Sequence, residues 1–98
     1  MEPPLTTDMT DRNRRPYFLW DESITIGELK ETLADGDEAE KIRLLAKILR
    51  EARDDEVWYF TNVQQVLDLW SQLAPRLGRR RAFWDFLFDA WRRHGLVG

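Results

Sequence analysis

The chain has 98 residues and no cysteine, and its 15 basic and 18 acidic side chains give a formal net charge of −3 at pH 7. This length suits one domain, and the lack of cysteine excludes disulfides and thiolate metal sites. No run approaches the roughly 20 apolar residues of a membrane span, and residues 1–4 lack the basic start of a signal peptide. We expect a soluble, cytoplasmic protein.

Charge is distributed unevenly along the chain. Residues 1–56 carry 9 Lys or Arg and 15 Asp or Glu, whereas residues 57–98 carry 6 Arg and 3 Asp. The first part therefore has a formal charge of −6 and the second +3. We favour mutual attraction within one domain over a basic surface for an acidic partner, because six arginines make a small electrostatic footprint.

Residues 1–15 are predicted to form a disordered N-terminal tail, because they combine prolines and charges with almost no residues that form a core. The apolar segment Pro16-Tyr17-Phe18-Leu19-Trp20 follows. It is too short for a helix, and proline biases its neighbour towards an extended conformation. We predict an extended arm that lies on a single helical domain comprising residues 16–98.

Apolar periodicity predicts an all-α fold. Thr25 and Glu28 have the spacing of a capping box that starts a first helix, and Gly36 is expected to end this helix in a left-handed conformation. A second helix is predicted from Asp37, its cap, to about Arg53. Its apolar residues spread over roughly 220° of the circumference, which predicts a central helix that is contacted on several sides.

The second half of the chain is predicted to be helical as well. After a short helical turn at residues 54–60, Thr61 and Gln64 are expected to cap an amphipathic helix over residues 62–73. The last helix is predicted over residues 79–94. Because the intervening loops are short, we expect a compact bundle of four to five short antiparallel helices with the extended N-terminal arm.

No residue constellation typical of an enzyme or a metal site is present in the sequence. The single histidine, His94, falls in the last helical turn, where it complements the helix dipole. The acids of residues 54–56 are explained by a helix N-terminus, and Asp85 and Asp89 by ion pairs with neighbouring arginines. We therefore predict a protein that is not an enzyme, without catalytic residues, cofactor or metal.

The last helix carries more apolar surface than a small fold readily covers. Its large apolar residues span about 200°, and Trp84, Phe88 and Trp91 cluster within about 60° of one another on one edge. Tryptophan and arginine are residues that anchor interfaces. One hypothesis is that these three residues bind a protein partner, with Arg81 and Arg92 at the rim. The equally weighted alternative is that the fold itself buries the aromatic edge.

An alternative function would use the C-terminal arginines to bind nucleic acid phosphates. The residues concerned are Arg76, Arg79, Arg80, Arg81 and Arg93, together with Arg92. The acidic total charge and the lack of a clear helix-turn-helix make nucleic acid the less favoured partner. A third hypothesis is a helical scaffold of the HEAT type that only associates with itself as a homodimer.

Several short motifs resemble those of a known group of proteins. They are Pro16-Tyr17-Phe18-Leu19-Trp20-Asp21, Gly36, Glu40-Lys41-Ile42, Ile48-Leu49, Glu56-Val57-Trp58 and Thr61. Over about residues 16–93 the chain resembles small prokaryotic helical proteins that are often encoded beside AbiEii-type nucleotidyltransferase toxins. The motifs are structural, so the resemblance transfers no catalytic residue. It implies a cytoplasmic antitoxin-like or regulatory partner of such a toxin.

Overall fold

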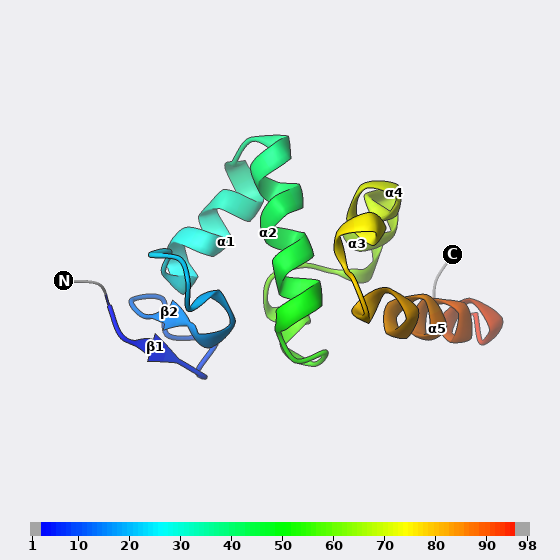
Figure 1. The fold of residues 1–98 in the computed structure, drawn as a ribbon, viewed down its shortest axis with the longest axis horizontal. Coiled ribbons are helices and arrows are strands. Elements are labelled where there is room, and N and C mark those ends of the chain that lie inside the picture. Colours follow the sequence, from blue (N-terminus) through cyan, green and yellow to red (C-terminus); the bar gives the residue numbers. More distant parts are fainter. Residues whose placement is uncertain (1–2, 96–98) are drawn as a thin grey trace.

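Short helices dominate the structure, a computed structural model that describes residues 3–95. In chain order the elements are the strands β1 (Leu5–Thr6) and β2 (Arg15–Pro16), the 3₁₀ turn η1 (Tyr17–Leu19), α1 (Ile26–Asp35), α2 (Glu38–Glu51), η2 (Glu56–Tyr59), α3 (Val63–Asp68), α4 (Trp70–Leu73), η3 (Ala74–Arg76) and α5 (Arg80–Arg93). The molecule measures 47 × 25 × 22 Å, with the N-terminal strands at one end and α5 at the other (Figure 1). The predicted compact, mainly helical fold is confirmed, and a two-residue parallel sheet is added to it.

The N-terminal segment belongs to the folded domain. Residues 3–15 form a loop closed by the β1–β2 pairing, and the side chain of Met9 is buried in the core. The carbonyl oxygens of Arg12 and Arg14 accept hydrogen bonds of 3.1 and 2.9 Å from the first two amides of α1, which have no partner within that helix. The predicted disordered tail is therefore wrong for residues 3–15, and residues 1–2 lie outside the described part.

The apolar segment after β2 is a 3₁₀ turn, which corrects the predicted extended arm. In η1, Phe18 and Leu19 are both buried against the rest of the core. An extended chain would point two successive side chains to opposite faces, whereas the turn lets both face inward. Trp20, expected to pack with them, is 70% exposed instead.

An ion-pair cluster holds the segment after η1 on α2. The carboxylate of Glu22 accepts hydrogen bonds of 2.9 and 3.0 Å from the guanidinium of Arg43 and one of 2.6 Å from Lys47. These donors, Arg43 first, hold the pKa of Glu22 at about 2, below its ordinary value of 4.5. Opposite charges near a carboxylate favour its ionised form. The cluster therefore links two segments that are about 20 residues apart in the sequence.

The caps of the first two helices follow the sequence closely. The capping box of Thr25 and Glu28 is present, and the Asp37 carboxylate accepts a hydrogen bond from the amide of Ala39. Gly36 is not left-handed as predicted, since its φ is −72°. A side chain at this position would instead place its Cβ only 2.4 Å from the carbonyl oxygen of Thr32, so close packing is what requires glycine here.

The predicted central position of α2 is confirmed. It contacts η1, α1, α4 and α5, and its inward residues form much of the core. These buried residues are Ile42, Leu44, Leu45, Ala46, Ile48 and Leu49. The helix ends at Glu51, slightly before the predicted end.

The segment that follows differs from its prediction in two details. Asn62, not Thr61, caps α3, because its side chain accepts the hydrogen bond from the amide of Gln65. The single helix expected over residues 62–73 is interrupted at Leu69, whose φ of −104° and ψ of 9° separate α3 from α4.

The predicted stop of α5 is confirmed at Gly95, which has a φ of 71°. Across residues 3–95, no helix has the length and apolar character needed to cross a bilayer.

Candidate protein-binding surface

The buried face of α5 joins this helix to the end of α2. Trp84 has no exposed surface, and its indole Nε1–H donates a hydrogen bond of 2.9 Å to the carbonyl oxygen of Leu49. Phe88 is 2% exposed and stacks on Trp84, with ring centroids 5.7 Å apart. The structure thus places both residues in the core, which is the alternative that the sequence left open, and removes them from the candidate surface.

Further rings surround this pair. Trp58 packs edge-on against Trp84 at 5.8 Å, and Trp70 packs edge-on against Phe88 at 5.3 Å. Trp91, the third predicted anchor, is half-buried and contacts Trp58 at 6.1 Å and Phe88 at 5.6 Å. Because such ring pairs add stability beyond their buried area, the predicted binding edge is mainly a structural cluster.

The opposite edge of α5 is the one left open. Phe86 is 67% exposed and Phe83 is 39% exposed. With Ala82 and Ala90 they lie within about 100° of one another on the helix, and we call these four residues the α5 strip. Large exposed apolar patches are a feature of interaction sites.

Sequence reasoning missed the α5 strip because the apolar arc of this helix has two edges. The periodic pattern reveals both edges but does not tell which one faces the core. The polar residues Arg81, Asp85 and Asp89 lie between the two edges on the helical wheel, so they do not indicate which edge is buried. The sequence feature that could have indicated the α5 strip was the pair of phenylalanines, Phe83 and Phe86, opposite the tryptophan-rich edge.

The predicted ion-pair ladder is present on α5. Arg81 lies 3.7 Å from Asp85, and Arg93 lies 3.1 Å from Asp89. All four side chains are more than half exposed, where ion pairs contribute little stability. Arg81, predicted as a rim residue, is thus already paired within its own helix.

The guanidinium of Arg80 lies against two aromatic rings. Its guanidinium lies 4.9 Å from the ring centroid of Phe83 and 5.8 Å from that of Trp84. Its Nε is buried without a hydrogen-bond partner in the described structure. Because a guanidinium over a ring face is held by cation–π attraction, Arg80 belongs to the aromatic cluster, and its role in phosphate binding stays a prediction.

The remaining predicted arginines do not form one row. Arg76, Arg79 and Arg92 are exposed and have no ion pair with a carboxylate of residues 3–95. They lie in η3, at the start of α5 and in its last turn, respectively. On the helical wheel Arg79 falls within the arc of the α5 strip, whereas Arg92 lies about 120° from Phe86.

Residues 3–95 contain no group of three His, Asp or Glu side chains placed to hold a metal ion. His94 is exposed, and its backbone amide donates to the carbonyl oxygen of Ala90 at the end of α5.

No protein-family model, curated protein or solved structure matches the chain. The resemblance to proteins encoded beside nucleotidyltransferase toxins therefore stays a prediction.

Proposed function

We propose that the protein is a non-enzymatic binding module that docks on another protein through the α5 strip. The observation that supports this most is the exposure of Phe86 and Phe83, three residues apart on one helix at the end of the molecule (Figure 1). Full burial of a phenylalanine is favourable by about 1.5–3 kcal/mol. Covering the 67% of Phe86 that is open would contribute about 1–2 kcal/mol on this scale.

Charge favours a partner other than a second copy. If two α5 helices paired antiparallel about Phe86, Arg79 of one copy would lie beside Arg93 of the other, because both are seven residues from the centre. Like charges across an interface oppose association. A partner with acidic residues beside an apolar surface would complement Arg79, which falls within the arc of the α5 strip and pairs with no carboxylate of residues 3–95.

The partner class that we propose is a nucleotidyltransferase toxin, which the protein binds in the cytoplasm as an antitoxin-like or regulatory subunit. This step rests on the motif resemblance over residues 16–93. The open apolar surface of the α5 strip also suits docking on a larger protein. The proposal assigns no catalytic step to the chain itself.

The test uses Phe86→Ala, with Trp20→Ala as its matched control. Both remove a strongly exposed aromatic ring, but Trp20 lies near η1, at the other end of the molecule. Each variant would be titrated by calorimetry against purified nucleotidyltransferase toxin from the same genome, and their melting temperatures compared. Phe86→Ala should raise the Kd about five- to thirtyfold, and Trp20→Ala should leave it unchanged.

Two outcomes would overturn parts of this proposal. Equal Kd values for wild type and Phe86→Ala would exclude the α5 strip as the contact. If the wild-type protein does not bind the toxin and sedimentation shows a dimer that Phe86→Ala dissociates, the strip serves self-association instead.

A further inference from the structure

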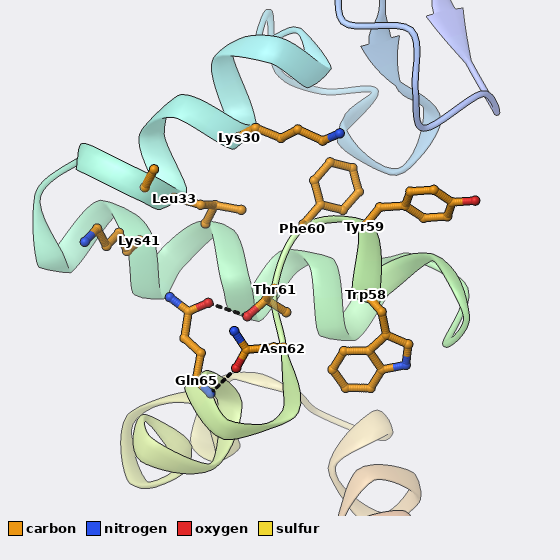
Figure 2. A pocket seen from close by; sticks show the side chains of 10 residues that line it. Lys30, Leu33, Lys41, Trp58, Tyr59, Phe60, Thr61, Asn62 and Gln65 are labelled. Carbon is orange, nitrogen blue, oxygen red and sulfur yellow. Dashed lines mark hydrogen bonds between the residues drawn. The ribbon is translucent and has the colours of Figure 1, made fainter.

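A pocket of about 470 Å³ opens beside α1, between the end of η2 and the start of α3 (Figure 2). Sites for small molecules have volumes of about 300–1,000 Å³. The pocket lies away from the α5 strip, since no residue of α5 lines it. It is therefore a separate feature of the molecule, and its chemistry can be considered independently.

The pocket concentrates positive charge in an acidic protein. The chain has three lysines and 18 acidic residues, yet Lys30 and Lys41 both line the pocket and its ten lining residues include no Asp or Glu. Neither lysine has a carboxylate of residues 3–95 within 4.0 Å. The positions three and four residues from Lys30 are Ile26, Gly27, Leu33 and Ala34, so its helix supplies no acid at the spacing of an ion pair.

A third donor lies at the same end as Lys41. The side-chain oxygen of Gln65 accepts a hydrogen bond from the hydroxyl of Thr61, so its amide nitrogen remains as a donor without an acceptor in residues 3–95. Figure 2 shows this side chain reaching from α3 towards α2, with its amide end between Lys41 and Thr61. A carboxylate or phosphate accepts strong hydrogen bonds from such donors.

Aromatic rings border the other end. Figure 2 shows Lys30 directed from α1 towards the rings of Phe60 and Tyr59. Its Nζ lies 5.8 Å from the ring centroid of Phe60, and Tyr59 is 54% exposed. An open ring with few intramolecular contacts provides a face on which a planar ligand can stack.

We propose that this pocket binds a small organic anion in which a carboxylate or a phosphate is joined to an aromatic ring. The anionic group is held by Lys41 and Gln65, and the ring lies against Tyr59 beside Lys30. The inference is independent of the docking function, because the two surfaces share no residue.

The probes separate the two parts of the ligand. Two probes carry both a ring and an anionic group: indole-3-acetate and adenosine monophosphate. Two carry the ring alone: 3-methylindole and adenosine. Two carry the anion alone: acetate and inorganic phosphate. Each would be titrated into ¹⁵N-labelled full-length protein and followed by amide chemical shifts. At least one ring-bearing anion should bind with a Kd below about 1 mM, shift the amides around Lys41 and Gln65, and bind at least about tenfold more tightly than its two fragments.

Matched substitutions test the assignment of residues. Lys41→Met should weaken binding about tenfold and Lys30→Met by less, because Lys30 borders the ring and not the anionic group. Arg53→Met, which removes an exposed charge outside the pocket, should leave binding unchanged. Gln65→Glu should abolish binding by repulsion, and Gln72→Glu, the same change at an exposed position of α4, should not.

The proposal fails if no ring-bearing anion binds, if neutral rings bind as tightly as their anions, or if the shifted amides lie in α5. Unchanged affinity in a Lys30→Met, Lys41→Met double variant whose amide spectrum remains dispersed would also overturn it.

Discussion

Trp84→Phe should destabilise the protein chiefly by removing one hydrogen bond. The last four carbonyl groups of a helix have no partner within it, and Leu49 is among those of α2. The amide of Arg53, four residues on, turns away to the hydroxyl of Tyr17 and the carboxylate of Glu56. The indole Nε1–H of Trp84 supplies the missing donor at 2.9 Å.

The size of the effect follows from this geometry. Phenylalanine retains most of the ring packing but leaves the carbonyl of Leu49 buried without its donor, which costs about 1–3 kcal/mol. The smaller ring adds a cavity, so the total is about 2–4 kcal/mol. At about 4–8 °C per kcal/mol for a domain of this size, the melting temperature should fall by at least about 8 °C. Trp84→Ala should cost about 3–5 kcal/mol.

The assay is urea and thermal unfolding followed by circular dichroism, with Trp20→Phe as the control. Trp20 is 70% exposed, so the same chemical change there should alter stability by less than about 0.5 kcal/mol. If Trp84→Phe and Trp20→Phe melt at the same temperature, the indole does not cap α2 and the reasoning is refuted.

Two further predictions concern polar groups near η1. Because Arg43 and Lys47 hold the pKa of Glu22 at about 2 instead of 4.5, its stabilisation is fully present above pH 4.5 and is lost as the pH falls towards 2. Glu22→Gln should therefore lower the melting temperature at pH 7, with the difference from wild type shrinking between pH 4.5 and 2; a constant difference would contradict this. Burial, and then the hydrogen bond to Glu56, raise the pKa of Tyr17 above its usual 10. Tyr17→Phe should cost about 1–3 kcal/mol at pH 7. The difference should be constant below pH 10, the usual pKa, and should be lost as the pH rises from there through the raised pKa; a difference that stays constant through this range would contradict the reasoning.

Features encoded by neighbouring residues could be predicted from the sequence. The capping box of Thr25 and Glu28 and the cap at Asp37 depend on side chains two or three residues from the amides that they bind. The central position of α2 followed from the width of its apolar arc, which no single neighbour can cover. The ladder on α5 likewise needs only the helical spacing.

Features that depend on distant backbone groups could not be predicted. Residues 3–15 look unstructured because they have few apolar side chains, but the carbonyls of Arg12 and Arg14 meet the open amides of α1. The conformation of Leu69 divides α3 from α4, but no glycine or proline in this segment predicts the interruption. The lysine pocket combines residues from α1, α2 and the segment leading into α3, so no sequence window contains it.

The rotation of α5 links these structural details to the proposed function. Its two apolar edges are similar in character, so a different rotation would place the tryptophans outside and the phenylalanines inside. The bond from Trp84 to the end of α2 selects one rotation, and Phe86, about 160° away on the helical wheel, must then face outward. The cap that stabilises α2 is thus also what exposes the α5 strip, so a change at the end of α2 should alter docking without touching the strip itself.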